Sequence, residues 1–425
     1  MGRELDTTGT FCPVPILKTG RIMKELAPGA KLTVLSDDSG ILTDMPDFCA
    51  AHGHAYLGSS EEAAGVFRVS IRKKRDGGRT RALGLLSGGL DSTLAARLLQ
   101  DQGVEVQGVH FSTGFCMVDH RRALSRPADL EEPERVRNQA LKVAGEHTIP
   151  LEVIDVADEY LETVVLNPKH GYGSAFNPCI DCRIFMLRKA DELAREQGID
   201  VVFTGEVVGQ RPKSQQRATL DLIEQEAGME GRLLRPLSAR HLTETEAEAD
   251  GRIDRDRLWH AHGRSRKEQF DLANRFGVDD FPTPGGGCCY LADHNFARRI
   301  RDLVAHSPSG SIARRSILLL KVGRHLRLGY NAKVVFGRDE AESTFLAREV
   351  RDEVWGVHVT DGRGSFGIIE GAPDRTRLET AAALAARYSR QRGCERVKVD
   401  LIREKSRESL EVVPATEDEL REWVI

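Results

Sequence analysis

Hydrophobic and polar positions along the chain first form the pattern of a small α/β unit over residues 1–73. Apolar residues recur at helical spacing over 16–26 and 44–52, and apolar strand-like runs occupy 31–35 and 66–71. Helices and strands of these lengths predict a two-layer α/β sandwich, the first of three domains.

A charged, glycine-interrupted stretch at 74–81 breaks this periodicity and predicts a linker. Strands alternating with helices follow as far as residue 294, an arrangement typical of α/β folds with a doubly wound parallel sheet. We predict such a sheet for 82–294, with strands at 82–86, 104–111, 151–156 and 201–204 and helices at 92–102 and 183–197.

The pattern changes again over 295–425, which predicts a third domain of α+β class. Basic helix and loop are followed by strands at 333–336 and 354–359 and an alanine-rich helix at 375–392. Between Arg298 and Lys333 there are nine Lys or Arg residues and one acid. Such a local excess of cations is typical of a surface that meets phosphates, and the alternative is a solvated helix face.

Composition narrows the class of protein. The 425 residues are 40% hydrophobic and 30% charged, and no apolar run approaches the roughly 20 residues that a membrane span needs. The N-terminus lacks the pattern of a secretory signal, which predicts a cytoplasmic protein with reduced thiols and no membrane partner. The eight cysteines are then expected to be catalytic, metal-binding or buried.

The first chemical motif lies between a strand and a helix, where backbone N–H groups and the helix dipole bind phosphate. It consists of Ser87, Gly88, Gly89, Leu90, Asp91 and Ser92. Asp91 suits Mg²⁺ that bridges phosphates rather than the phosphates themselves, since like charges repel. The motif resembles the SGGxDS signature of the PP-loop ATP pyrophosphatases, which implies that ATP is cleaved between its α and β phosphates and that AMP is transferred to a substrate oxygen.

A second part of the expected nucleotide site follows the strand at 201–204. Gly205 and Glu206 stand there in a Thr-Gly-Glu turn, at the carboxyl edge of the sheet where open α/β folds bind ligands. The turn is similar to one beside the nucleotide in PP-loop thiolases, and an ordinary strand-to-helix loop is the alternative.

Two thiols, Cys179 and Cys182, stand three residues apart where a helix begins, and the helix dipole there favours thiolate. Asn177 to Cys182 resembles the NPxxxCN segment of the tRNA 2-thiouridine synthases, which implies that Cys182 bears sulfur. With Cys288 as third thiol the set also resembles the ligands of the iron–sulfur PP-loop thiolases, implying a [4Fe-4S] cluster held by Cys179, Cys182 and Cys288. The alternatives are a Cys182 persulfide resolved by Cys288 or Cys289, or inert structural thiols.

Cys12 is the remaining candidate. It precedes Pro13, a residue that suits the first turn of a helix, so its thiolate is favoured. The segment resembles the CPxP signature of the TusA sulfur carriers, which implies that Cys12 carries a persulfide. A buried structural cysteine is the alternative. Residues 319–339 resemble the RNA-binding segment of the NFACT ribosome-rescue proteins.

Together these motifs predict an ATP-dependent sulfurtransferase. It would adenylate a tRNA uridine and insert sulfur relayed from Cys12, with tRNA and an upstream donor such as a cysteine desulfurase as partners. The rival is a PP-loop ligase or amidotransferase acting on a small metabolite, and a non-enzymatic sulfur-carrier or RNA-binding protein is a third hypothesis. The rival leaves the carrier-like segment and the paired thiols without a use.

Overall fold

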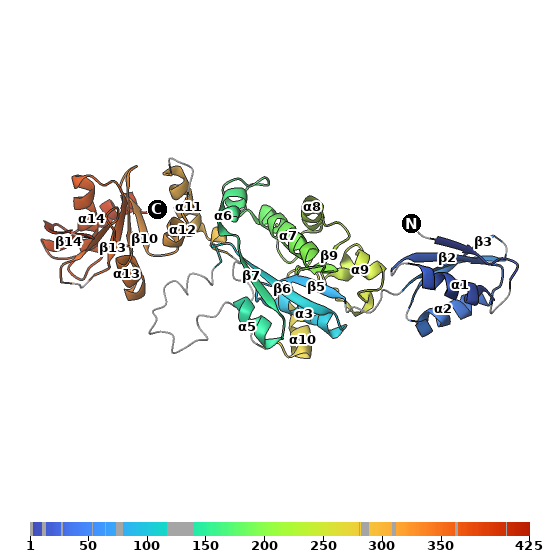
Figure 1. Ribbon diagram of the computed structural model, residues 1–425. Coiled ribbons are helices and arrows are strands. Elements are labelled where there is room, and N and C mark those ends of the chain that lie inside the picture. The colour runs from blue at the N-terminus through green and yellow to red at the C-terminus, as the bar shows by residue number, and fades with distance from the viewer. Residues whose placement is uncertain are drawn as a thin grey trace. The chain divides into compact units, whose positions relative to one another are not determined.

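Three β-sheets organise the described part of the chain, shown in Figure 1. The computed structural model describes residues 3–10, 14–26, 29–52, 54–63, 65–73, 80–116, 139–279, 281, 289–307, 312–361, 364–404 and 406–425. The chain forms two compact units, one of residues 1–86, 90–108 and 189–279, the other of 87–89, 109–188 and 280–425. In the described ranges, none of the helices combines the length and the hydropathy that crossing a membrane requires.

The first sheet has the order β1-β2-β4-β3, with β1 parallel to β2 and the other neighbours antiparallel. Its inward residues Leu32, Val34, Val69 and Ile71 form a core with residues of two helices. The layers are the predicted α/β sandwich, although β1 and β3 were not anticipated. The elements are β1 (Arg3–Asp6), α1 (Val14–Glu25), β2 (Lys31–Ser36), α2 (Ile41–His52), β3 (Ala55–Ala63) and β4 (Val66–Arg72).

The second sheet has the order β7-β6-β5-β8-β9, and β5, β8 and β9 run parallel. This confirms the predicted α/β fold. Gly84 of β5 lies opposite Phe203 of β8, so the fully buried Phe203 ring fits where a side chain on residue 84 would collide with it. The strands are β5 (Arg81–Leu85), β6 (Glu105–Ser112), β7 (Leu151–Asp155), β8 (Val201–Phe203) and β9 (Leu233–Leu234).

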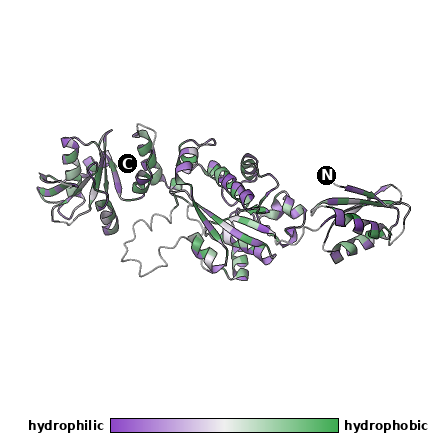
Figure 2. Ribbon diagram, in the orientation of Figure 1, coloured by the Kyte–Doolittle hydropathy of each residue, from purple (hydrophilic) through white to green (hydrophobic). Residues whose placement is uncertain are grey.

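Amphipathic helices accompany this sheet, and Figure 2 shows hydrophobic and hydrophilic residues alternating along them. One of these helices, α7, begins at Cys179, four residues before its predicted start at 183, so both of its cysteines lie inside its first turn. The α-helices are α3 (Leu90–Asp101), α5 (Gln139–Glu146), α6 (Ala157–Tyr160), α7 (Cys179–Glu196), α8 (Arg217–Ala227), α9 (Glu246–Ala249) and α10 (Lys267–Phe276).

The third sheet has six strands in the order β10-β11-β13-β12-β14-β15, and every neighbouring pair is antiparallel. Successive side chains of β11 point to opposite faces of the sheet, and both faces are covered. Val334 and Phe336 belong to the core that includes residues of α14. Val335 belongs to a second core, which includes Leu346 of α13. The strands are β10 (Arg324–Arg327), β11 (Ala332–Phe336), β12 (Trp355–Val359), β13 (Gly367–Gly371), β14 (Val397–Arg403) and β15 (Ser406–Val412). The helices are α11 (His294–Ala305), α12 (Arg314–Leu320), α13 (Glu340–Ala347), α14 (Arg375–Arg387) and α15 (Glu417–Trp423).

A buried carboxylate joins the last two strands. Asp400 of β14 is fully buried and lies directly opposite Ser409 of β15, whose hydroxyl donates to Asp400 Oδ1 at 2.6 Å. Arg407 donates to the other carboxylate oxygen. Burial favours protonation, but these hydrogen bonds outweigh it, so the pKa of Asp400 lies below its ordinary value.

A buried lysine lies on β11, the second strand in the order of the same sheet. Lys333 of β11 is 4% exposed, and burial lowers its pKa from an ordinary 10.5 to about 8. Between these two pH values the unfolded chain binds a proton that the folded chain does not bind. Raising the pH through this interval therefore stabilises the fold, and lowering it toward 8 removes that stabilisation.

Lys333→Met should stabilise the third sheet at pH 7 by at most about 3 kcal/mol, because it removes the charge that burial disfavours. The advantage of the variant should shrink as the pH rises from 8 to 10.5. Guanidinium unfolding followed by the fluorescence of Trp355, on β12 of the same sheet, measures this difference. Lys398→Met, at an exposed position on β14, is the control, and an equal effect of pH on both variants would contradict the prediction.

Candidate functional site

The turn before α3 has the features of a phosphate-binding loop. Gly88 has φ +74°, a left-handed conformation that favours glycine, and the Gly89 N–H donates to Ser87 Oγ at 3.4 Å. α3 begins directly afterwards with the buried Leu90, and Ser92 is also buried. Since the first N–H groups of a helix have no partner within it, this turn offers the kind of anion site predicted from the sequence.

Asp91 is held in the first turn of α3 by a relay of two buried glutamines. Gln210 Nε2 donates to Asp91 Oδ2 at 2.6 Å, and Gln269 Nε2 donates to Gln210 Oε1 at 2.9 Å. Arg266 Nη2 lies 3.9 Å from the same Asp91 oxygen. The sequence singled out Asp91 but gave these three residues no role, because Gln269 and Arg266 come from the distant start of α10.

The other carboxylate oxygen of this residue, Asp91 Oδ1, is buried and has no hydrogen-bond partner among the described residues. A buried acceptor without a partner costs about 1–3 kcal/mol. A carboxylate oxygen is a ligand that Mg²⁺ prefers, so the residue fits the cation expected at this loop. Asp91 would hold it through the oxygen that Gln210 does not occupy.

The turn after β8 packs directly against the start of α3. A Cβ at Gly205 would lie 2.5 Å from the carbonyl carbon of Asp91 and 2.5 Å from the backbone nitrogen of Ser92, which is closer than any side chain can approach. Only glycine allows this contact. The turn after β8 and the first turn of α3, both predicted to lie beside a nucleotide, are thus in contact at their backbones.

The Glu206 side chain is buried and hydrogen-bonded to neighbouring protein groups. It is 3% exposed, and its Oε2 accepts from Thr204 Oγ1 at 3.1 Å and from Arg235 Nε at 3.2 Å. Arg235 in turn donates to Glu224 at 2.6 Å. The carboxylate therefore fixes the turn at the end of β8, and its expected contact with a nucleotide stays a prediction.

Cys179 and Cys182 lie in the first turn of α7, three positions apart and so on one face of the helix. Both are partly exposed. Asn177 Nδ2 donates to Cys179 Sγ at 3.0 Å, and the Asp181 carboxylate accepts the Lys169 N–H at 2.9 Å. These bonds fix the segment that leads into the helix and hence the thiols at its start.

The structure describes only some of the other predicted thiols. Cys12 and Cys288 lie outside the described residues, and Cys289 lies within them, partly exposed. Within the described ranges, no three His, Cys, Asp or Glu side chains are arranged to hold a metal ion. The described residues therefore do not form a complete ligand set for a [4Fe-4S] cluster, which stays a prediction.

The basic residues expected to meet phosphates have different environments. Arg327 Nε donates to Asp302 at 2.9 Å, so this arginine is held in an ion pair. Arg324 is more exposed, and its guanidinium carbon lies 5.3 Å from the centre of the Tyr388 ring. Burial lowers the pKa of His325 well below its ordinary range, and Lys333 adds to this effect. Arg324 is accordingly better disposed to meet an outside ligand than Arg327 or His325.

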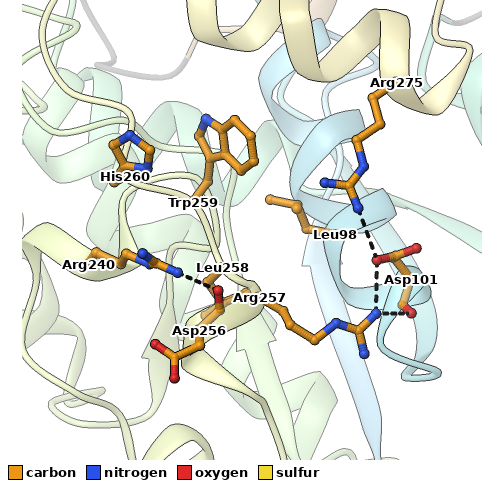
Figure 3. A pocket seen from close by; sticks show the side chains of 9 residues that line it. All are labelled: Leu98, Asp101, Arg240, Asp256, Arg257, Leu258, Trp259, His260 and Arg275. Atoms are coloured by element: carbon orange, nitrogen blue, oxygen red, sulfur yellow. Dashed lines mark hydrogen bonds and ion pairs between the residues drawn. The ribbon is translucent and has the colours of Figure 1, made fainter.

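A separate pocket of about 300 Å³ lies at the far end of α3 from Asp91. Figure 3 shows Arg257 and Arg275 both directed at the Asp101 carboxylate, which neutralises part of their charge. Arg240 donates to the backbone of Asp256. The pocket thus lies away from the predicted nucleotide turn. Its lining residues are Leu98, Asp101, Arg240, Asp256, Arg257, Leu258, Trp259, His260 and Arg275.

Comparison with known families accounts for the three parts of the chain. Residues 3–73 match the model of sulfurtransferase TusA. The sulfur carrier protein TusA of Pseudomonas entomophila is 43% identical over 72 residues, which are 17% of this chain and 89% of that protein. Through residues 3–73, the chain belongs to the TusA family. The sequence-based assignment of this part is confirmed.

Beyond the TusA domain, residues 80–236 match the model of the tRNA methyl transferase HUP domain, and residues 323–424 match the NFACT protein RNA binding domain. The tRNA-specific 2-thiouridylase MnmA of Syntrophotalea carbinolica is 40% identical over 128 residues, which are 28% of this chain. The chain spans 32% of that protein's own length. These matches confirm the predicted PP-loop and NFACT-like resemblances.

Among solved structures, the complex of a 4-thiouridine synthetase with RNA and bound ATP is similar to this chain at 16% sequence identity and a TM-score of 0.26. The match covers 65% of this chain and 71% of the other.

Gly205→Ala should destabilise the first turn of α3 by about 1–3 kcal/mol, because its Cβ overlaps backbone atoms that have no rotamer to move. Hydrogen exchange of the amides in the second turn of α3, which donate to carbonyls of the first turn, measures the local loss of stability. Gly145→Ala is the matched control, since Gly145 lies in α5 with open space at its Cβ. Equal protection of the α3 amides in both variants would contradict the prediction.

Proposed function

We propose that this chain is an ATP-dependent tRNA sulfurtransferase that adenylates a uridine carbonyl and replaces its oxygen with sulfur. One observation carries the proposal: a TusA domain and a HUP domain with a phosphate-binding type of turn occur in one chain. The MnmA relatives are named as tRNA-specific 2-thiouridylases, which supports tRNA as the substrate. A small-metabolite ligase, the rival, has no use for the TusA domain.

For this function we keep the domain boundaries expected from the sequence. They are a carrier domain at 1–73, a linker at 74–81, a catalytic domain at 82–294 and an RNA-binding domain at 295–425. We also propose the cytoplasm as its compartment, where thiols stay reduced.

The first step of the proposed reaction is activation of the uracil. The carbonyl oxygen attacks the α-phosphorus of ATP, the bond to the β-phosphate bridging oxygen breaks, and pyrophosphate leaves. Ser87, Gly88, Gly89 and Ser92 would bind the phosphates through their backbone and hydroxyl groups, and Gly205 and Glu206 would flank the nucleotide. Mg²⁺, when bound by Asp91, neutralises charge on the phosphates.

The second step replaces the activated oxygen. In the persulfide route, the Cys182 thiolate attacks the outer sulfur of a Cys12 persulfide, whose S–S bond breaks and releases the Cys12 thiolate. The outer sulfur on Cys182 then attacks the activated carbon, and AMP leaves with the oxygen. Attack by Cys288 or Cys289 on Cys182 Sγ leaves the transferred sulfur on the uracil and forms a disulfide, which a dithiol reductant reduces.

The alternative for sulfur delivery is the [4Fe-4S] cluster. Cys179 and Cys182, with Cys288 or Cys289 as third thiol, would hold it and leave one iron open to sulfide. An upstream donor of the cysteine desulfurase class would charge Cys12 in the persulfide route.

The C-terminal part supplies the proposed contact with RNA. Tyr330 is 63% exposed and its ring centre lies 5.3 Å from that of His306, which offers an aromatic surface of the kind on which unpaired bases stack. Arg324 would add a cation to the same domain. Tyr330 and Arg324 lie in the part of the chain that matches the NFACT RNA binding domain, and this match supports the proposed binding to tRNA.

Asp91→Asn should lower ATP-dependent release of pyrophosphate about 100-fold or more while leaving the fold intact. The amide can still accept from Gln210, but it no longer offers Mg²⁺ a charged oxygen. Pyrophosphate is measured in the presence of tRNA, and thermal unfolding reports the fold. Asp101→Asn, in the last turn of the same helix, should release pyrophosphate normally. Wild-type release by Asp91→Asn would remove the role assigned to Asp91.

Cys182→Ser should abolish thiolation and still release pyrophosphate, since both sulfur routes use Cys182 only after activation. Mass spectrometry of tRNA nucleosides measures the thiolation. Cys179→Ser separates the routes. With a cluster, anaerobic wild-type protein should contain roughly four irons per chain, and the variant should lose iron and activity together.

In the persulfide route, iron-free protein should be active in air, and Cys179→Ser should be impaired less than Cys182→Ser. Cys12→Ser should then be inactive with a persulfide donor and active with added free sulfide, because sulfide attacks the activated carbon directly, AMP leaves with the oxygen, and no persulfide is needed. Full thiolation by Cys182→Ser would falsify both routes.

A further inference from the structure

An isolated antiparallel bridge pairs Cys116, beyond the end of β6, with Cys289. The Tyr290 N–H donates to the Phe115 carbonyl at 3.0 Å, so the hydrogen bond joins the residues that flank the two cysteines. The pair itself is therefore of the non-hydrogen-bonded kind, in which Cα atoms are about 4.5 Å apart and side chains lie closest. Disulfides accept Cα separations of about 4.4–6.8 Å, so this backbone geometry suits a disulfide.

The bridge is held firmly on both strands. Phe115 is 1% exposed, and its ring packs edge-on against Phe296 at a centroid distance of 6.2 Å. Tyr290 packs on the same Phe296 ring at 5.4 Å. Lys321 Nζ donates to the Gly114 carbonyl at 2.6 Å and lies 5.3 Å from the centre of the Tyr290 ring. The two cysteines are thus kept opposite each other by their neighbours.

The two cysteines of the pair are more exposed than a core cysteine of this chain. Cys116 and Cys289 are partly exposed, whereas Cys49 is 1% exposed in its core and burial raises its pKa to about 11. Thr113 Oγ1 lies 3.8 Å from Cys116 Sγ, close enough for a hydrogen bond that helps to orient the thiol. The pair thus combines partial exposure with two cysteines that lie opposite each other.

We propose that Cys116 and Cys289 form a thiol–disulfide exchange pair, with Cys116 as the thiol that resolves disulfides formed on Cys289. With glutathione disulfide as oxidant, the Cys289 thiolate attacks one sulfur and releases one glutathione thiolate. The Cys116 thiolate then attacks Cys289 Sγ, releases the second glutathione thiolate and closes the protein disulfide. Two protein thiols are oxidised, and one glutathione disulfide is reduced to two thiols.

The pair deepens the proposed sulfur transfer, on whose persulfide route this part rests. When Cys289 has formed a disulfide with Cys182, attack by Cys116 on Cys289 Sγ breaks that bond and releases the Cys182 thiolate. The disulfide is moved to the bridge without net oxidation. Cys182 can then accept sulfur again, and a dithiol reductant reduces the bridge later.

The pair is tested on the full chain by oxidation with glutathione disulfide, followed by peptide mass mapping without reduction. Wild-type protein should give a linked Cys116–Cys289 peptide. In Cys116→Ser, Cys289 should remain joined to glutathione, which raises the ratio of mixed to internal disulfide at Cys289 about tenfold or more. The exposed Cys394 is the internal comparison and should stop at the mixed disulfide in both proteins.

Two results would overturn the pair. One is wild-type protein in which Cys289 carries glutathione while Cys116 can still be alkylated. The other is a Cys289 linked to Cys288 or Cys182 as the final product. The wild-type map alone decides this, so a variant that folds poorly does not obscure the answer.

The role in sulfur transfer has its own measurement. Cys116→Ser should give a normal single turnover of thiolation and slower later turnovers when the dithiol reductant is limiting, and Cys394→Ser should match wild type in both. Unchanged later turnovers in Cys116→Ser would remove the role. Disulfide mapping needs neither ATP nor RNA, so failure of the pair and failure of the proposed function are distinguishable.

Discussion

The contact between the Gly205 backbone and the peptide that joins Asp91 to Ser92 is the constraint on which the predicted nucleotide site depends. Neither side of the contact can yield, because both are backbone. The start of α3 is therefore fixed relative to the end of β8. Gln210, five residues beyond Gly205, is brought to Asp91 as a result, and Gln269 secures it from a third element. One close approach thus fixes a carboxylate together with the residues that orient it.

The carboxylate is oriented asymmetrically, and this matters for its chemistry. One oxygen is occupied by Gln210, and the other is buried without a hydrogen bond from the described residues. A fully hydrogen-bonded aspartate would be a structural residue, whereas this arrangement leaves a ligand atom with a defined direction. The two thiols in the first turn of α7 also have different surroundings. Asn177 donates a hydrogen bond to Cys179, and Cys182 lies three positions later on the helix.

Elements with a strong local signal were predictable from the sequence. The glycine pair before α3 and the strands β5 to β8 depend on neighbours in the chain, and such signals survive in any context. β15 was not predicted because it is mostly polar and exposed. β14 was not predicted because the buried Asp400 stands in the middle of its apolar run. The relay behind Asp91 escaped because Gln210 and Gln269 are 59 residues apart, a separation that no local pattern spans. The bridge between Cys116 and Cys289 escaped for the same reason.

The carboxylate of Asp400 also has a consequence for how the third sheet ends. β15 is the last strand in the order and leaves one edge exposed, where strands tend to slip or to recruit another chain. A shift of β15 by one residue would turn the Ser409 hydroxyl to the opposite face and leave a buried charge without this donor. The hydrogen bond between Ser409 and Asp400 therefore favours the observed register over registers shifted by one residue. It does so at β15, a mostly exposed strand whose hydrophobic burial discriminates little between registers.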